Sequence, residues 1–473
     1  MESKETIFTK IKNNINIKYL YMMTWLILAV VILITIFFRA PLGFFDEHIH
    51  YIKAVGVSRG QFLSVNGANQ GELGQLIPPA NNNYVNYFLD TLDEVEPINN
   101  EWLLDEINTE RPSRNEEQFV NSTSAAPYTP LPYAGAALGS AVARALEVNV
   151  ELEVVLMRLG SAIFSIVLIW LAFKIAPKKY KWTILAVALI PQSIASFAAI
   201  STDGFTIAVA LLFMATLLRI IHSAIAKTVN NKEIIYLGLA SLLVIGAKMP
   251  LFLLVGLIIP LIVIFKKSFS KKQKMLLWTI FSICVILTLL WAAYAANINT
   301  GAYWGRDVST FGQLKFIINN VVIYTANLGF SILSYPFNDI TYGMYANHPK
   351  YGTMPFLVDI LLIWGLAMSA FLQSDEKKPT KKQIQFYWWQ LILFILSVIA
   401  IFTLLYLQFT TVGERWKIEG VQPRYFVPFI PLLIMTPFKI KISKNVKILA
   451  YAAPFIGVAI YSLFIIAQLA GLK

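Results

Sequence analysis

The stretch YLYMMTWLILAVVILITIFFRAPLGFFDEHIHY, residues 19–51, decides the fold. Its first part, 19–38, is almost wholly apolar, and about 20 such residues in a helix cross the ~30 Å hydrocarbon core of a bilayer. Basic residues precede this run and no clear small-residue cleavage site follows it, so we interpret it as a retained anchor rather than a signal peptide. The acid pair Asp46-Glu47 opens a polar stretch where the chain leaves the lipid, which favours chemistry at the membrane surface.

The whole chain has the composition of a membrane protein. Of its 473 residues, 57% are hydrophobic and 14% are charged, whereas about 25% of the residues of a soluble protein are charged. Apolar runs of spanning length recur along the sequence, and only helices or closed barrels satisfy the backbone inside lipid. Because the runs are uninterrupted, we predict an all-α polytopic membrane protein.

The charges are distributed as the positive-inside rule requires. Of 39 Lys and Arg residues, 24 fall in six short segments between hydrophobic runs, which we place in the cytoplasm. Of 27 acids, 16 lie between Asp46 and Glu153, so the largest loop is acidic and is expected outside. The net charge of +12 therefore indicates a lipid bilayer and not nucleic acid as the partner. We expect a multi-pass protein of a bacterial plasma membrane, with the N-terminus in the cytoplasm and the C-terminus outside.

Hydropathy and charge together predict about eleven transmembrane helices. These spans are expected near residues 19–39, 155–175, 182–200, 205–222, 233–247, 250–265, 275–296, 354–373, 385–406, 424–438 and 448–470. The chain then divides into a cytoplasmic N-terminus (1–18), the first transmembrane helix (19–39), a large first extracytoplasmic loop with surface helices (40–154), a transmembrane core (155–296), a second large extracytoplasmic segment (297–353) and C-terminal transmembrane helices (354–473). Residues 315–335 are apolar but contain three asparagines, so we prefer one or two helices on the outer surface, with two crossings as the alternative.

Asp46 is the first candidate for chemistry. If it opens a surface helix, Asp46, His50 and Lys53 share one face, and Glu47 and Tyr51 lie on the neighbouring face. A carboxylate at the lipid boundary can act as a general base, because partial desolvation raises its basicity. The alternative is an exposed acid that favours the positive end of the helix dipole.

Two further features of the outer side could hold ligands. His48 and His50 with Asp46 could form part of a divalent metal site, but no further ligand is evident nearby, so solvated or hydrogen-bonded histidines are the alternative. Asp203 lies in the turn Ser201-Thr202-Asp203-Gly204 between two spans. It could support the site or bind a metal, and the alternative is a helix cap.

Basic residues are scarce on the outer side. Among them we single out Lys248, Arg306, Arg415 and Arg424. A cation at this boundary suits the phosphate of a lipid, although basic side chains also extend toward headgroups without a specific ligand. Walker, dinucleotide-binding, zinc and nucleophile-elbow motifs are all missing, and the cytoplasmic loops are short. A sugar or acyl donor would therefore have to arrive on a membrane carrier.

Four motifs occur in a recognisable order. They are Phe45-Asp46-Glu47-His48-Ile49-His50-Tyr51, Tyr128-Thr129-Pro130-Leu131-Pro132-Tyr133, Ser201-Thr202-Asp203-Gly204 and Arg424-Tyr425-Phe426-Val427-Pro428. With this order and placement the chain resembles the GT-C superfamily of integral-membrane glycosyltransferases. It resembles most closely the bacterial membrane family known as domain of unknown function 2142, from about residue 40 to 440. Thr129 and Thr202 depart from the residues usual at those positions.

The resemblance implies a GT-C-like fold and roles for particular residues. Asp46 would be the catalytic base, Glu47 its neighbour in the site and Asp203 a supporting acid or metal ligand. A polyprenyl-phosphate sugar would be the donor, and its phosphate would lie near the outer cations. His50, Tyr51, Tyr128 and Tyr133 would form the shell of first-loop side chains. No cofactor is required by the resemblance, and a divalent metal is left open.

We therefore expect an inverting glycosyltransferase that moves a sugar from a lipid phosphate to a cell-wall or surface glycan. A polysaccharide polymerase or ligase, which would use outer arginines, is one alternative. A transporter or flippase of lipid-linked sugars is another, disfavoured by the lack of internal repeats. The sugar, the linkage, the acceptor and the oligomeric state are not encoded in a readable motif.

Overall fold

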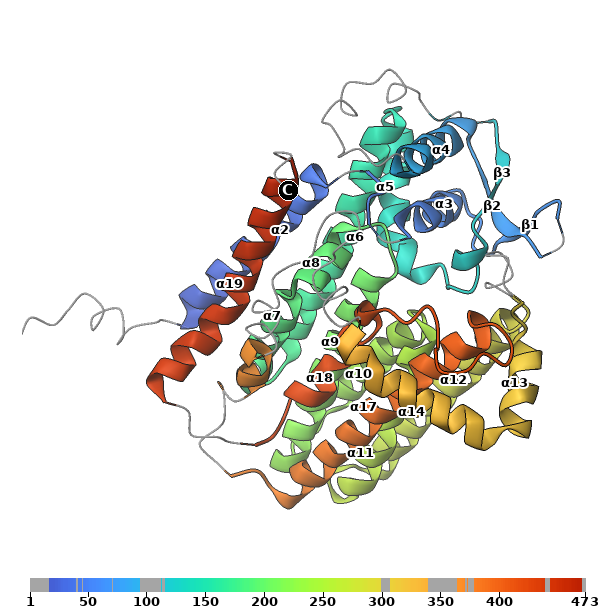
Figure 1. Cartoon of the computed structure of the whole chain (residues 1–473). Coiled ribbons are helices and arrows are strands. Elements are labelled where there is room, and N and C mark those ends of the chain that lie inside the picture. Colours follow the sequence, from blue (N-terminus) through green and yellow to red (C-terminus); the bar gives the residue numbers. More distant parts are fainter. Residues whose placement is uncertain are drawn as a thin grey trace, which may run out of the picture.

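The computed structural model describes residues 17–93, 112, 115–298, 307–338, 364–372, 378–438 and 443–469, apart from positions 40, 45, 70 and 371. Figure 1 shows long helices below a smaller layer of short helices and strands formed by the first loop. Arg306 and most of the span expected near 354–373 lie outside the described residues.

Six helices among the described residues are long and apolar enough to cross a membrane. They are α2 (Ile17–Phe38), α6 (Val150–Ile175), α9 (Asp203–Ala226), α12 (Lys271–Ala295), α17 (Lys381–Gln408) and α19 (Lys444–Leu469). The number rises to eight if each of two bent pairs is a single span. The chain is thus a helical membrane protein with several spans, as predicted, while a count of about eleven is not confirmed.

The two bent pairs occur at segments where we had expected a span or surface helices. The segment near 182–200 forms α7 (Lys181–Ala188) and α8 (Pro191–Ala198), which meet at 71°. Pro191 is the first residue of α8, and a proline disfavours helical conformation in the residue before it. Residues 310–338 form α13 (Thr310–Asn319) and α14 (Val321–Asn338), which meet at 108°. A sharp turn at Asn320 therefore divides this apolar segment into two helices, which is compatible with the preferred surface arrangement.

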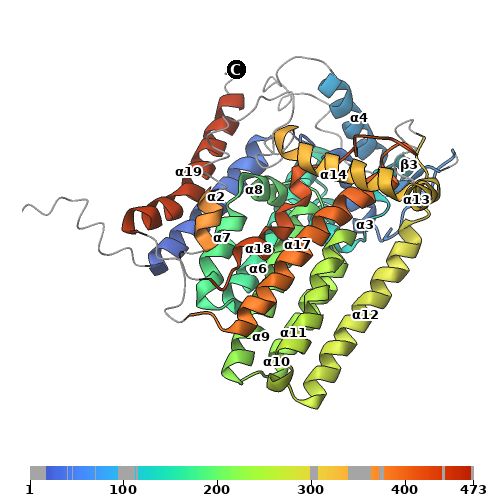
Figure 2. The same ribbon diagram turned by 60° about the horizontal axis from the view of Figure 1, so that its bottom comes forward.

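Helix α9 is the centre of the membrane part. In its most apolar window 94% of the residues are buried inside the protein. Around it pack α6, α8, α10 (Asn231–Ile245) and the apolar segment made of η6 (Met249–Leu257) and α11 (Ile258–Ile264). The late chain adds η10 (Pro423–Tyr425), η11 (Val427–Phe429) and α18 (Ile430–Ile434) against the same core. In Figures 1 and 2, α19 lies beside α2 at the edge of this bundle.

The first loop forms its own layer with a separate hydrophobic core. Its helices are α3 (Glu47–Ser58), α4 (Pro79–Asp93) and α5 (Ala134–Ala145), with the short turns η3 (Thr123–Ala125) and η4 (Leu131–Tyr133). Strands β1 (Val65–Asn66), β2 (Leu73–Ile77) and β3 (Gln118–Asn121) pair antiparallel in the order β1-β2-β3. The all-α prediction is corrected here, because β2 pairs with a strand more than 40 residues later, Gly74 lying opposite Asn121, and such a pairing leaves no local pattern.

Glycines hold the small-residue helix α5 against α6. A Cβ built on Gly135 would lie 2.5 Å from the carbonyl oxygen of Gly160, and one on Gly160 would lie 2.1 Å from that of Gly135. Backbones that approach so closely gain dispersion contacts, which is the usual way helices associate in membranes. Helix α5 therefore fixes the first-loop layer to the membrane part.

Candidate active site

Asp46 precedes α3 in an unusual backbone conformation. Its φ of 58° and ψ of 12° are left-handed, a region that Asp and Asn occupy more readily than most side chains. Asp46 is the N-cap residue of α3, but its carboxylate makes no capping hydrogen bond to that helix. Instead Oδ2 lies 2.6 Å from Nη2 of Arg424, and 42% of the Asp46 side chain is exposed. Burial is the largest single influence and would raise the pKa of this carboxyl, but the neighbouring positive groups, Arg424 first among them, together hold that pKa below its ordinary value.

Arg424 connects two carboxylates. It lies in η10, is 93% buried, and contacts Asp46 on one side while its Nε lies 3.3 Å from Oδ2 of Asp203 on the other. A planar guanidinium can address two acids at once, whereas a lysine ammonium is a single point charge. The position of Arg424 between them argues against simple extension toward lipid headgroups.

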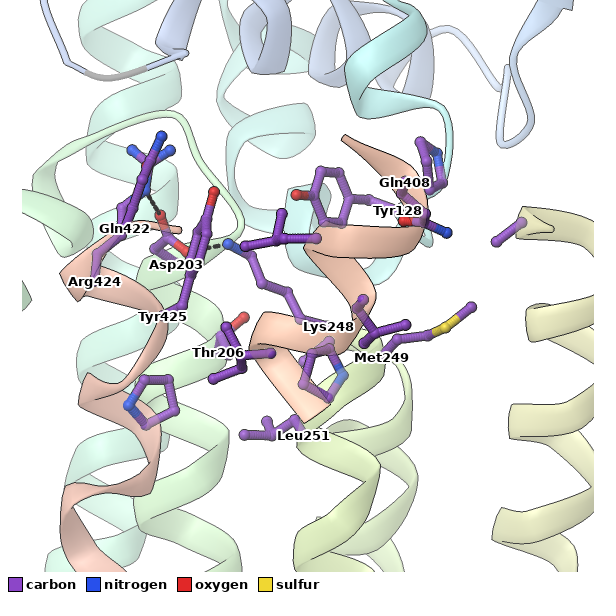
Figure 3. Close-up of a pocket in the computed structure, with 18 of the residues that line it drawn as sticks. Tyr128, Asp203, Thr206, Lys248, Met249, Leu251, Gln408, Gln422, Arg424 and Tyr425 are labelled. Carbon is purple, nitrogen blue, oxygen red and sulfur yellow. Dashed lines mark hydrogen bonds and ion pairs between the residues drawn. The ribbon is translucent and has the colours of Figure 1, made fainter. Parts of the chain in front are cut away.

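Asp203 and Lys248 complete the cluster, as Figure 3 shows. Asp203 is the first residue of α9 and pairs through Oδ1 with the ammonium of Lys248. That ammonium also lies 4.7 Å from the ring centroid of Tyr425 and 5.5 Å from that of Tyr128. Two acids and two cations from four distant segments thus form one cluster with a formal charge of zero, which we call the charged tetrad: Asp46, Asp203, Lys248 and Arg424.

His50 lies behind the tetrad in the first-loop layer. Its Nδ1 is 2.7 Å from the hydroxyl of Tyr133, and its ring lies 5.5 Å from that of Tyr128. Burial is the largest influence on this imidazole and lowers its pKa to about 4, although the charge of Asp46 acts in the opposite direction. His50 is therefore neutral at physiological pH and acts as a hydrogen-bonding partner of Tyr133.

The tetrad forms the polar end of a cavity of about 250 Å³. The opposite walls come from η6, α12, α17 and η11 and are mainly apolar, with Leu251, Ala295, Ile401, Leu405 and Phe429 among them. One continuous space therefore joins a charged surface to an apolar region at the depth of the membrane helices. This polarity suits an amphiphilic ligand.

Three side-chain oxygens in this cavity are buried without a hydrogen-bond partner. They are Ser124 Oγ, Thr288 Oγ1 and Gln422 Oε1, and all three residues line the cavity. A buried polar atom left without a partner costs about 1–3 kcal/mol, so these atoms mark positions where a polar ligand would be favoured. The sequence analysis identified none of the three. Only Gln422 could have been found from the sequence, because it lies two residues before Arg424.

Glu47 belongs to a different group from Asp46, although the two are adjacent. Its side chain is fully buried and accepts two bonds from Arg158, Nε to Oε1 at 2.9 Å and Nη2 to Oε2 at 2.6 Å. It also accepts the backbone N–H groups of Phe44 and Ile200 at 3.3 and 3.0 Å. Glu47 does not line the cavity, and its contacts fasten the start of α3 to α6 and to the turn before Asp203. In the sequence, Arg158 is a single charged residue within an apolar run, and this placement indicates that a buried acid pairs with it.

Of the remaining predicted residues, some line or contact the cavity and the others lie away from it. Tyr128 lines the cavity, and Tyr133 contacts it through His50, whereas Tyr51 is buried in the first-loop core, where its hydroxyl accepts from Asn81. Lys53 donates to Ser64 Oγ at 3.1 Å and does not join the tetrad. Arg415 is exposed in the loop after α17 and does not line the cavity.

The described residues contain no group of three or more His, Cys, Asp or Glu side chains placed to hold a metal ion. His50 is engaged with Tyr133, and Asp46 and Asp203 face cations. The charge that a metal would bring to the two acids is supplied by Lys248 and Arg424.

The fold and the site together define a multi-pass helical membrane protein with a charged tetrad at one end of an amphiphilic cavity. The chain belongs to the family described as "Predicted membrane protein (DUF2142)", which matches residues 28–433 and hence all four tetrad residues. A search of curated proteins and a search of solved structures each found no match.

Proposed function

We propose that this protein transfers a sugar from a polyprenyl-phosphate donor to a glycan acceptor at the membrane surface. The observation that carries the proposal is the amphiphilic cavity, in which two cations and a part-exposed carboxylate lie next to an apolar region. A lipid phosphate sugar has the same sequence of properties: an apolar chain, an anionic phosphate and a polar sugar. The charge distribution supports the outer face of the plasma membrane as the place of reaction.

The donor phosphate would bind at Arg424 and Lys248. Arg suits a phosphate because it can donate two parallel hydrogen bonds, and Lys248 adds a second positive charge. The apolar walls would hold the first part of the lipid chain. Ser124, Thr288 and Gln422 would provide hydrogen bonds to the sugar, because their buried oxygens have no partner within the protein.

Asp46 would act as general base. It would take the proton of an acceptor hydroxyl, whose oxygen would then attack the anomeric carbon while the bond from that carbon to the phosphate oxygen breaks. The lipid phosphate would leave with the electron pair, and the configuration of the sugar would invert. Engagement of Arg424 by the incoming phosphate would loosen its pair with Asp46 and raise the basicity of that carboxylate. Glu47 would serve as a positioning residue, since it holds the start of α3 against Arg158.

The experiment is transfer by purified protein in lipid nanodiscs, with a panel of polyprenyl-phosphate sugars and a crude wall-glycan acceptor. Asp46→Asn is the test variant, because Asn tolerates the left-handed backbone that Asp46 occupies. Glu117→Gln is the matched control, since Glu117 is an acid of the same layer paired with an arginine, Arg59, away from the cavity. The proposal requires transfer by wild type and the control, and a loss of about 10²–10⁴-fold in Asp46→Asn.

Other outcomes point elsewhere. Full transfer by Asp46→Asn with loss in Arg424→Lys would favour the arginine-dependent polymerase or ligase. Movement of a labelled lipid-linked sugar across the bilayer, without covalent transfer, would favour a transporter.

A further inference from the structure

A second cavity, of about 290 Å³, lies among the ends of membrane helices. Its walls come from the turn around η5 (Lys178–Tyr180), the last part of α9, the first part of α17 and the segment after α18. None of its lining residues lines the cavity of the charged tetrad. It is therefore a separate space within the described part of the chain.

The charge of this cavity is positive. Lys178, Lys179 and Arg219 line it, and no acid does. Arg219 pairs with Glu233 at 3.0 Å, so the net positive charge is carried by the two lysines. Lys179 donates to the carbonyl oxygen of Pro437 at 3.0 Å, which fixes its stem along the wall. All these cations belong to the basic turns that the positive-inside rule places in the cytoplasm.

A buried amide at this cavity has an unused donor. Gln390 lines the cavity and is 1% exposed, yet its Nε2 has no hydrogen-bond partner. It is nine residues along α17 from Lys381, and at 1.5 Å per residue it lies about 13 Å from the start of that helix. A buried N–H without a partner costs free energy. A ligand with an acceptor oxygen that enters the cavity would remove this cost.

We propose that this cavity binds a phosphate compound of net negative charge, with lysines at the mouth and the Gln390 amide inside. Basic pockets between helices on the cytoplasmic side suit the headgroups of anionic lipids. The same chemistry is available to a soluble phosphate compound. The site is independent of glycosyl transfer, so it stands or fails separately from the proposed function.

The test measures binding of phosphatidylglycerol to the full chain in a zwitterionic detergent by native mass spectrometry, with phosphatidylcholine as reference lipid. Lys178→Gln/Lys179→Gln should weaken phosphatidylglycerol binding by about thirtyfold, as expected for two basic groups near a phosphate. Lys271→Gln/Lys272→Gln is the matched control, because these exposed lysines start α12 and do not line the cavity. Gln390→Leu should also weaken binding, whereas Ser397→Ala, a buried polar change on the same helix whose hydroxyl already donates to Leu393, should not.

Inorganic phosphate and glycerol 1-phosphate distinguish the two sources. If neither competes at millimolar concentration, the ligand is a lipid headgroup; if either binds alone and is lost in the same variants, it is a soluble phosphate compound. Equal losses in both lysine pairs, with no effect of Gln390→Leu, would overturn the proposal, because they would reduce the effect to general attraction between basic turns and anionic lipid. Equal binding of phosphatidylcholine would also overturn it.

Discussion

Nη2 of Arg424 lies 2.6 Å from Oδ2 of Asp46, although 378 residues separate the two in the chain. The same arginine reaches Asp203, which in turn holds Lys248. Any chemistry at this site therefore depends on a charge arrangement built from the first loop, the start of α9, the start of η6 and the late segment η10. Each of these contacts can be tested by substitution.

Arg424→Lys should leave the protein folded and impair donor binding. A lysine keeps the positive charge but cannot contact Asp46 and Asp203 with separate nitrogens. We expect KM for the lipid phosphate sugar to rise about tenfold or more, with a smaller change in kcat. Steady-state kinetics in nanodiscs would measure this, and an unchanged KM would remove Arg424 from the phosphate site.

Glu47→Gln should destabilise the protein more than Asp46→Asn does. Arg158 is 1% exposed and would lose a buried carboxylate partner, which typically costs about 3–5 kcal/mol. Asp46 is 42% exposed, so loss of its charge is partly compensated by water. Unfolding midpoints in detergent would compare the two variants.

The matching control is the double variant Glu47→Gln/Arg158→Met. Because the two residues share one interaction, the double variant should lose less stability than the sum of the single changes. Additive losses would mean that the pair does not fasten α3 to α6.

His50 should make stability depend on pH. Its pKa is about 4 in the folded protein, against an ordinary value of 6.5, because burial disfavours the charged imidazole. Between these two values the unfolded chain binds more protons, so stability should be full above pH 6.5 and fall as the pH is lowered toward 4, by on the order of 3 kcal/mol. Thermal unfolding measured from pH 4 to 8 would give the slope of stability against pH. His50→Gln should flatten it, whereas a change at the exposed His222 should not.

Lys53→Met should stabilise the protein near neutral pH. Lys53 is fully buried, and burial lowers its pKa from 10.5 to about 8. Because the unfolded chain binds the proton more tightly, the wild type carries its full cost below pH 8 and loses it as the pH rises toward 10.5. We expect a gain of about 1–3 kcal/mol at pH 7 that shrinks at pH 10. A variant less stable than wild type at pH 7 would show that the bond to Ser64 outweighs the burial cost.

Gln422→Leu should lower kcat/KM by about tenfold without lowering the unfolding midpoint. Its Oε1 has no partner in the protein, so the substitution removes no internal bond from that atom, while a sugar hydroxyl would lose an acceptor. A lower midpoint with normal kcat/KM would assign Gln422 to packing instead.

Much of this arrangement was predictable from the sequence. The apolar runs predicted α2, α6, α9, α12, α17 and α19, and the scarcity of basic residues on the predicted outer side singled out Lys248 and Arg424, which both lie in the tetrad. Other features depend on contacts that leave no local pattern. The separation of Asp46 from Glu47 follows from the left-handed backbone at Asp46, which places neighbouring carboxylates in different surroundings. The strand pairing around Gly74 is likewise set by the tertiary fold.

The order of the tetrad along the chain has a consequence for biosynthesis. Of the four residues Asp46 emerges first, Asp203 and Lys248 can pair soon after their helices insert, and Arg424 emerges last. Until then Asp46 has no partner in the tetrad and can remain solvated at the membrane surface. The charged tetrad is thus incomplete until Arg424 has been synthesised, and a ribosome that stops before residue 424 would release a chain without it.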